Sequence, residues 1–240
     1  MATGSTTDFV APSAAPTVPV PRLEPGDRLT RAEFERRYEA MPDIKKAELI
    51  EGVVYMPSPV RMDVHGAPHA DLLAWLATYR AATPGVSAGD NATLVLDNDN
   101  MPQPDGLLMI DAACGGQATI DSKGYIEGPP ELIAEIASST VSIDLHDKLH
   151  VYRRNGVRQY IAWRVLDRAI DWFILRDGEY VLLAPGADGV LRSEVFPGLW
   201  LNASAMLNGK LDAVLATLQQ GIATPEHQDF VTWLASREKK

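Results

Sequence analysis

Apolar and polar residues along this chain repeat with the periods of strands and of helices. Short segments that alternate or are continuously apolar, and that end at turn residues, predict β-strands. They lie at 47–56 with a turn near Gly52, and at 93–97, 106–110, 131–137, 159–165, 169–175 and 179–184. The segment 166–168 predicts a hairpin connection between two of them. The middle of the chain is therefore expected to form a sheet.

Other segments carry helical spacing and helix boundary signals. Thr30 and Glu33 form a capping box ahead of an apolar face. Gly156 is a stop signal after a stretch with basic residues in its second half. Helices are expected from about Thr30, at 68–80, at 142–154, and beyond Asn202 in one or two pieces broken near Gly221 and Pro225.

The order of helix, strands, helix and strands predicts an α/β fold, with a mixed β-sheet core flanked by helices. Residues 1–25 are rich in Ala, Pro, Ser and Thr without apolar periodicity, which predicts a disordered arm. The folded domain is expected at 26–201, and a C-terminal helical extension at 202–240. This class of fold does not by itself define an activity.

Composition narrows the function classes. The formal net charge is −10 and the pI about 4.9, which argues against a generic nucleic-acid binder. It does not exclude a protein that meets phosphate through a bound cation and a few local Lys or Arg residues. No apolar run approaches the roughly 20 residues that span a bilayer. The single cysteine, Cys114, cannot form an internal disulfide, which fits a reducing cytosol, and a cytoplasmic location is expected.

Two acidic residues stand in apolar strand patterns. Asp105 opens the strand 106–110, and Glu135 shares a strand face with Ile133 and Ala137. An ionised carboxylate between apolar neighbours is costly unless a cation or several donors meet it. If the two strands are neighbours, the acids would converge on an oxygen-ligand site suited to Mg²⁺. Spacing alone leaves open a solvent-facing Glu135 and an Asp105 that merely sits in a turn.

The helix at 142–154 places three polar residues on one face. Asp144, Lys148 and Tyr152 follow one another at intervals of four. From spacing alone, a surface Asp–Lys pair beside a half-buried tyrosine is the simpler interpretation.

The histidines also come in pairs with a spacing of four residues. His65 and His69 could be taken for a zinc pair, but neither a third ligand nor an HExxH motif accompanies them. His69 is expected on the surface. His146 and His150 flank Lys148 on other helix faces and are expected to be solvated.

Taken in order, these motifs resemble a known family. The motifs that carry the resemblance are Pro104-Asp105, Glu135-Ile136-Ala137-Ser138, the segment Asp144 to Lys148, Tyr152, Gly156-Val157 and Tyr160. Supporting motifs are Glu48 to Val54, Met56-Pro57-Ser58-Pro59, His65, Gly178-Glu179-Tyr180 and Phe196-Pro197-Gly198-Leu199. Together they resemble the Uma-two family of predicted restriction endonucleases, which belongs to the PD-(D/E)xK nuclease superfamily. The resemblance extends from about Glu33 to Leu207 and implies a restriction-endonuclease-like fold.

The resemblance also implies roles for individual residues. Asp105 would be the acid of the "PD" half-motif and Glu135 the second acid. The usual lysine of the superfamily would fall at Ala137, which cannot serve, and Lys148 on the following helix would take that role. Glu48 resembles the family's upstream glutamate. It would join the site, or else have a buried structural role.

Metal-assisted phosphodiester hydrolysis is the implied chemistry. Mg²⁺, or Mn²⁺ as a substitute, would be held by Asp105, Glu135 and the carbonyl of Ile136. The implied accessory residues are His65, Asp144 and Tyr152.

The resulting hypothesis is a Mg²⁺-dependent endonuclease that acts on DNA and forms a homodimer. Two alternatives remain. One is a catalytically silent binding or regulatory module with the nuclease fold, which the acidic net charge favours. The other is a metal-dependent hydrolase of RNA or nucleotides.

Overall fold

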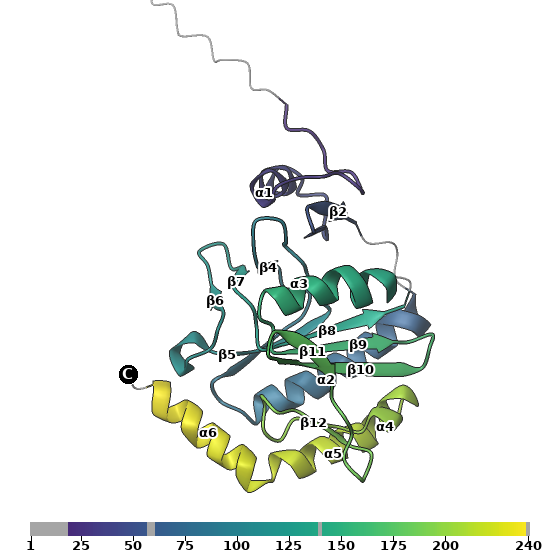
Figure 1. The fold of residues 1–240 in the computed structure, drawn as a ribbon, viewed down its shortest axis with the longest axis vertical. Coiled ribbons are helices and arrows are strands. Elements are labelled where there is room, and N and C mark those ends of the chain that lie inside the picture. The colour runs from purple at the N-terminus through teal and green to yellow at the C-terminus, as the bar shows by residue number, and fades with distance from the viewer. Residues whose placement is uncertain (1–18, 57–60, 139–140, 239–240) are drawn as a thin grey trace, which may run out of the picture.

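A six-stranded mixed sheet forms the centre of the molecule (Figure 1). The structure is a computed structural model that describes residues 19–56, 61–138 and 141–238. The strand order is β11-β10-β9-β8-β5-β3. The bounds are β3 (Val86–Gly89), β5 (Gly106–Ile110), β8 (Leu132–Ala137), β9 (Gln159–Arg164), β10 (Ala169–Arg176) and β11 (Glu179–Leu182). Within this sheet β8 and β9 pair in parallel and the other neighbours pair antiparallel.

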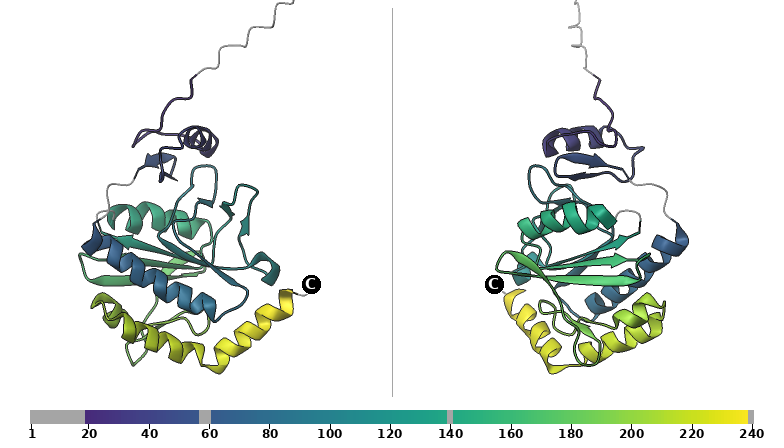
Figure 2. Two further views of the ribbon diagram at one scale, coloured as in Figure 1. Left: turned by 180° about the vertical axis from the view of Figure 1, so that it is seen from behind. Right: turned by 45° about the vertical axis from the view of Figure 1, so that its right-hand side comes forward.

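One face of the sheet is covered by α2 and by the C-terminal helices (Figure 2). The bounds are η1 (Met62–Gly66, a π-helical turn), α2 (Ala67–Ala81), α4 (Ala203–Leu207), α5 (Leu211–Ile222) and α6 (Pro225–Glu238). Trp75 of α2 and Trp172 of β10 pack edge to face in this layer, with ring centroids 5.8 Å apart. Burying an apolar side chain of this size contributes about 3 kcal/mol. Buried residues of the C-terminal helices, among them Met206 and Val214, belong to the same apolar cluster, so these helices complete the main core.

The other face carries the connection between the two parallel strands. It comprises the π-helical segment η3 (Ile143–Lys148) and α3 (Leu149–Arg154). Val151, Tyr152 and Ile133 belong to one buried apolar cluster on this face. Parallel neighbours cannot be joined by a tight turn, so the chain must cross over the sheet here. The alternation of β8 consequently directs Glu135 toward the crossover helix, while Ile136 packs in the core on the α2 side.

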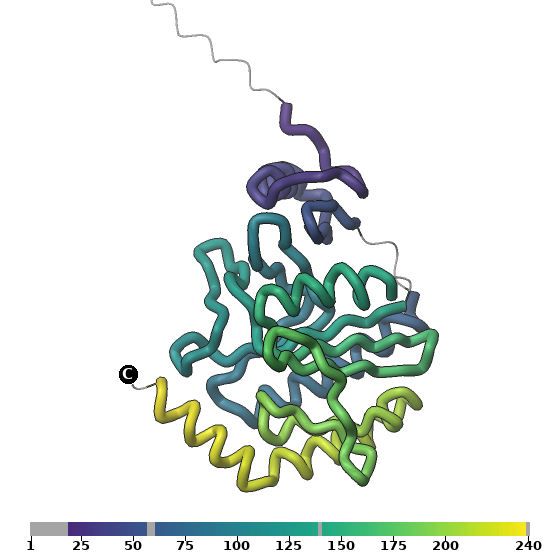
Figure 3. Tube along the Cα trace, in the orientation of Figure 1, coloured from purple at the N-terminus to yellow at the C-terminus, as the bar shows by residue number. Residues whose placement is uncertain are grey.

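The N-terminal part forms a small unit next to the loops that precede β5 (Figures 1 and 3). It comprises α1 (Arg31–Glu39) and a hairpin of β1 (Glu48–Ile50) and β2 (Val53–Tyr55). Leu49 exchanges two backbone hydrogen bonds with Met101, at 3.2 and 2.8 Å. Leu23, Phe34 and Met101 are buried together in a separate apolar cluster. The hairpin is thereby fixed beside the start of β5.

Short elements complete the fold. A three-stranded sheet joins β4 (Leu94–Val95), β7 (Ile126–Glu127) and β6 (Thr119–Ile120), and β12 (Leu191–Arg192) pairs with β13 (Trp200–Leu201). A 3-10 turn, η2 (Ala112–Cys114), follows β5. None of the helices in the described ranges is long and apolar enough to cross a membrane.

The predicted α/β class, a mixed sheet with helices on it, is confirmed. The hairpin at 166–168 joins β9 to β10, and the helical tail is broken between Ile222 and Pro225 as expected. The described part of the tail has three helices rather than the expected one or two, because the short helix α4 precedes α5. The sequence pattern did not predict β3 or the small sheet strands β6 and β7. Of the predicted arm, residues 1–18 lie outside the described residues, as do Pro57 and Pro59 of the family motif.

Candidate active site

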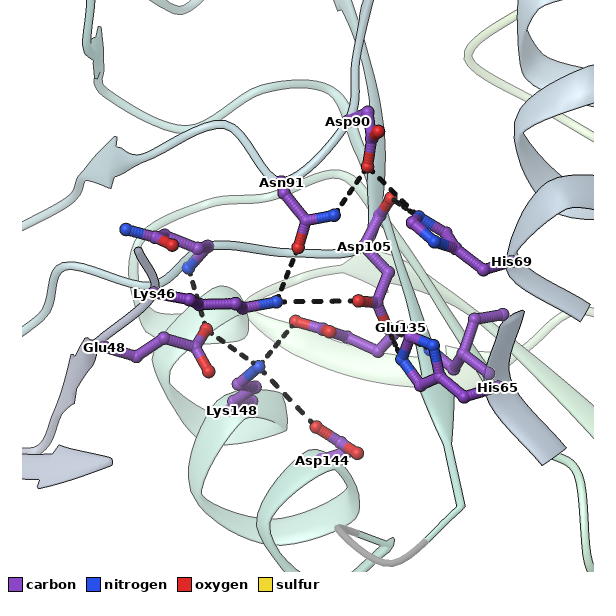
Figure 4. A network of polar contacts seen from close by, with 12 residues as sticks. Lys46, Glu48, His65, His69, Asp90, Asn91, Asp105, Glu135, Asp144 and Lys148 are labelled. Carbon is purple, nitrogen blue, oxygen red and sulfur yellow. Dashed lines mark hydrogen bonds and ion pairs between the residues drawn. The ribbon is translucent and has the colours of Figure 1, made fainter. Parts of the chain in front are cut away.

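Asp105 and Glu135 come from adjacent strands at the same end of the sheet (Figure 4). In the antiparallel pair of β5 and β8, Gly106 stands opposite Ala134. Continuing this register by one residue puts Asp105 opposite Glu135. The backbone N–H of Ile136 donates to Asp105 Oδ2 at 2.8 Å. Asp105 is 4% exposed and Glu135 3%, so the solvent-facing alternative for Glu135 is wrong.

The strand pairing also directs the carbonyl of Ile136. The carbonyls of Glu131 and Ala137 accept from the backbone N–H groups of Gln159 and of Val165, which follows β9, at 2.9 and 3.1 Å, so these positions face β9. By strand alternation Ile136 faces the β5 side, where its N–H meets Asp105. Pairing with β5 extends only to Gly106, so the Ile136 carbonyl is directed past the end of β5, beside Asp105. The backbone of Ile136 therefore faces Asp105 at this end of the sheet.

Lys148 lies among three carboxylates. Its Nζ is 2.9 Å from Glu135 Oε1, 3.0 Å from Glu48 Oε1 and 3.7 Å from Asp144 Oδ1. The lysine side chain is 6% exposed. The interpretation of Asp144 and Lys148 as a surface pair is therefore wrong. Segments with π-helical winding are rare and often occur at functional sites, and η3 carries both residues here.

Two further contacts fix the acids around Lys148. The hydroxyl of Tyr152, one turn beyond Lys148, donates to Glu135 Oε1 at 2.7 Å. The backbone N–H of Gln103 donates to Glu48 Oε1 at 2.7 Å. Glu48 belongs to the N-terminal hairpin, so a residue from 87 positions before Glu135 enters the same cluster. Tyr152 therefore contacts Glu135, and Glu48 contacts Lys148.

The charges of this cluster do not balance. Burial alone would lower the pKa of Lys148, but the carboxylates of Glu135, Glu48 and Asp144 outweigh burial and hold that pKa well above its usual value. Burial raises the pKa of Glu135. Lys148 opposes this shift, but the negative charges of Asp105, Asp144 and Glu48 add to it. One ammonium group is shared by several carboxylates, which leaves Glu135 short of positive charge.

Asp105 has the opposite character. Burial raises its pKa, but the hydrogen bond from His65, the charge of Lys46 and the N–H of Ile136 outweigh burial and lower the pKa to about 2. His65 Nε2 lies 3.4 Å from Asp105 Oδ2. Asp105 therefore has the lower pKa of the two acids.

His69 supports Asp105 from its backbone side. The Nε2 atom of His69 lies 2.8 Å from the carbonyl oxygen of Asp105 and 3.1 Å from Asp90 Oδ1. Its side chain is mostly buried, so the expectation that His69 is a surface residue is wrong. His146 and His150 are exposed, as expected.

A second lysine at the site was not predicted from the sequence. Lys46 Nζ lies 3.6 Å from Asp105 Oδ1 and donates to Asn91 Oδ1 at 2.6 Å, while Asn91 donates to Asp90. Lys46 precedes β1, and the Asp90-Asn91 pair follows β3. A lysine in a Lys-Lys doublet and an Asp-Asn pair in a loop give no signal in the sequence. Only the packing of the N-terminal hairpin brings them to Asp105.

The side chains fit a small divalent cation. Asp105, Glu135 and the Ile136 carbonyl offer the hard oxygen donors that Mg²⁺ and Mn²⁺ take. Among the described residues, no three His, Cys, Asp or Glu side chains form a ready-made metal site. Mg²⁺ does not require one, since it commonly binds through one or two carboxylates and keeps several waters. The raised pKa of Glu135 also reflects negative charge that a cation would offset.

A mixed sheet that brings two acids and a helix-borne lysine to one strand end defines a restriction-endonuclease-like protein. The family model Uma2, described as "Putative restriction endonuclease", matches residues 31–204, and the chain belongs to this family. The fold is similar to the crystal structure of a protein from Anabaena variabilis ATCC 29413, described as a "putative nuclease belonging to DUF820". The two share 11% sequence identity with a TM-score of 0.50, over 83% of this chain and 97% of that chain. No curated protein matches the sequence.

Proposed function

We propose that the protein is a Mg²⁺-dependent endonuclease that hydrolyses phosphodiester bonds of DNA. The observation that carries this proposal is that buried Asp105 and Glu135 stand opposite one another at one end of β5 and β8, with the Ile136 N–H bound to Asp105. Membership of the Uma2 family supports a nuclease. DNA and, as the resemblance implies, a second copy of this chain are the partners in this proposal.

The proposed metal ligands are Asp105, Glu135 and the Ile136 carbonyl. A bound divalent ion would polarise the phosphodiester and lower the pKa of a coordinated water. Asp105 is already ionised and oriented by the Ile136 N–H and His65. Glu135 receives hydrogen bonds from Lys148 and Tyr152 on Oε1, and no described residue donates to Oε2. Oε2 is therefore the oxygen of Glu135 that can face a cation.

The remaining residues of the cluster hold these acids in place. Lys148 fixes the orientation of Glu135 and offsets the negative charge of Glu48 and Asp144. Glu48 in turn is held by the backbone of Gln103, so the hairpin and the sheet end are tied together through the lysine. These contacts keep the acids in position before substrate arrives, which lowers the cost of assembling the site.

The test is a cleavage assay with matched variants. Supercoiled plasmid, single-stranded DNA, RNA and nucleotides are each incubated with the protein in Mg²⁺, Mn²⁺ or EDTA. We expect DNA cleavage with either metal, none in EDTA, and none for Asp105→Ala. Asp229→Ala removes the same charge from an exposed position of α6 and should cleave as the wild type does. Cleavage that persists in Asp105→Ala would come from a contaminant and would contradict the proposal.

The same assay addresses the two alternatives. Turnover of RNA or nucleotides but not DNA would assign a different phosphoester substrate to the same acids. Absence of any cleavage, together with no rise in the thermal unfolding temperature on adding Mg²⁺ or Mn²⁺, would favour a non-catalytic binding module. The net charge of −10 is the observation that favours the non-catalytic binding module.

A further inference from the structure

The two lysines near the acids differ in what they can reach. Lys148 is 6% exposed, and its ammonium meets Glu135, Glu48 and Asp144 within 4 Å. An ammonium has three N–H donors. The N–H donors of Lys148 point to the carboxylates around it, so few of them are left to bind a group that arrives from solution.

Lys46 has the opposite setting. Its side chain is 25% exposed, and it reaches Asp105 from the segment just before β1, whereas Lys148 comes from the crossover helix (Figure 4). Asn91 Oδ1 accepts one of its hydrogen bonds at 2.6 Å, and Asp105 Oδ1 lies 3.6 Å away, beyond hydrogen-bond length. Among the described residues no other acceptor is bound to its Nζ, which leaves N–H donors for an incoming anion.

We propose that Lys46 is the lysine that contacts the phosphate group of the substrate, whereas Lys148 is a positioning residue that holds the carboxylates. This assignment rests on the proposed nuclease function and adds a residue to it. A phosphate oxygen that approaches Asp105 with a cation enters beside Lys46. The ammonium of Lys46 can then move the short distance from Asp105 Oδ1 to the phosphate while it keeps its hydrogen bond to Asn91. A partly exposed lysine of this kind offsets charge on the reacting phosphate.

Asn91 and Asp90 connect Lys46 to the residues that support Asp105. Asn91 donates to Asp90 at 2.6 Å, and Asp90 in turn lies beside His69, which contacts the backbone of Asp105. The loop after β3 therefore aims Lys46 and supports Asp105 through one continuous set of contacts. Asn91 adopts a left-handed backbone conformation, with φ of 49°, which asparagine tolerates better than most residues.

The test compares Lys46→Gln with Lys45→Gln. Lys45 is the adjacent, exposed residue, so the two variants remove the same charge from neighbouring positions. Binding of a labelled DNA duplex is measured in Ca²⁺ and in EDTA at several salt concentrations, along with single-turnover cleavage in Mg²⁺ at saturating DNA. Loss of one phosphate contact should reduce the slope of log K against log salt by about 0.9 for Lys46→Gln only. The cleavage rate of this variant should fall by about 100-fold.

Lys46→Arg serves as the conservative variant and should restore the salt slope and much of the rate, because it keeps the charge. Thermal unfolding of each variant, measured in parallel, establishes that it is folded. If the wild type cleaves DNA and Lys46→Gln matches Lys45→Gln in slope and rate, the assignment of Lys46 fails and the nuclease proposal stands. If the wild type neither cleaves nor binds DNA, both proposals fail.

Discussion

Replacing Glu135 by glutamine should stabilise the metal-free protein, even though it removes a proposed metal ligand. Glu135 is buried and shares the single ammonium of Lys148 with Glu48 and Asp144. Glutamine has nearly the same shape and no charge. The substitution therefore removes the electrostatic cost of a crowded carboxylate while the surrounding packing is kept.

The magnitude follows from the pKa of Glu135, which is raised from an ordinary value of 4.5 to about 8. Because the folded state holds this proton more tightly than the unfolded state, the contribution to stability is complete below about pH 4.5. It is lost as the pH rises toward 8. One pKa unit corresponds to about 1.4 kcal/mol, so the loss over this window has an upper bound of about 5 kcal/mol. Glu135→Gln should lack this pH dependence.

The assay is urea unfolding in EDTA at pH 5, 7 and 9. Glu131→Gln is the matched control, because Glu131 is also buried but accepts backbone hydrogen bonds from Ile110 at 2.8 Å and Gln117 at 3.0 Å. Glutamine at this position would place its amide N–H against one of these two backbone N–H groups. This should lower the free energy of unfolding by about 1–3 kcal/mol at all three pH values. The reasoning is refuted if wild type and Glu135→Gln lose stability in parallel between pH 5 and 9, or if Glu135→Gln is the less stable at pH 9.

Three further predictions concern the same region and its support. Lys148→Met leaves buried carboxylates without their shared ammonium, and should lower the free energy of unfolding at pH 7 by about 3–5 kcal/mol in urea titrations, whereas Lys45→Met should change it little. Asp105 has a pKa lowered from 3.8 to about 2, so it contributes stability above about pH 4 that is lost as the pH falls toward 2. Asp105→Asn should lack that contribution of about 2 kcal/mol. Acid unfolding followed by circular dichroism measures it, and identical profiles for the variant and the wild type would contradict the prediction. A Cβ at Gly116 would lie 1.8 Å from the carbonyl oxygen of Ile110, so Gly116→Ala should cost about 3 kcal/mol, and an unaltered thermal unfolding temperature would contradict this.

The sequence predicts the acids of the site better than their surroundings. The apolar residues around Asp105 and Glu135 predict that both acids are buried. A buried carboxylate is costly unless a cation or several donors meet it, so such a position stands out in the sequence. Their register depends on which strands pair, and β8 and β5 do pair. The burial of Lys148 could not be decided from its spacing, since a surface ion pair has the same pattern. The family resemblance, rather than periodicity, singled it out.

Other parts lacked any local signal. The edge strand β3 reads Val-Ser-Ala-Gly, with a burial pattern that a loop would share. Lys46 and Asn91 are 45 residues apart and meet only because the hairpin docks beside the loop after β3. His69 was misplaced for the same reason, as its partner is a backbone carbonyl 36 residues away. Tertiary contacts of this range leave no trace in the spacing of the residues themselves.

The crossover between the parallel strands β8 and β9 has a consequence for how such a site can vary. Since β8 and β9 are parallel, the chain has to cross over the sheet between Ala137 and Gln159, and the helix of this crossover lies against Glu135. Residue 137, on the strand, and residue 148, on the helix, therefore offer two anchoring points from which an ammonium can reach Glu135. Moving the lysine from residue 148 to residue 137 would need two substitutions and would leave the order of the strands as it is.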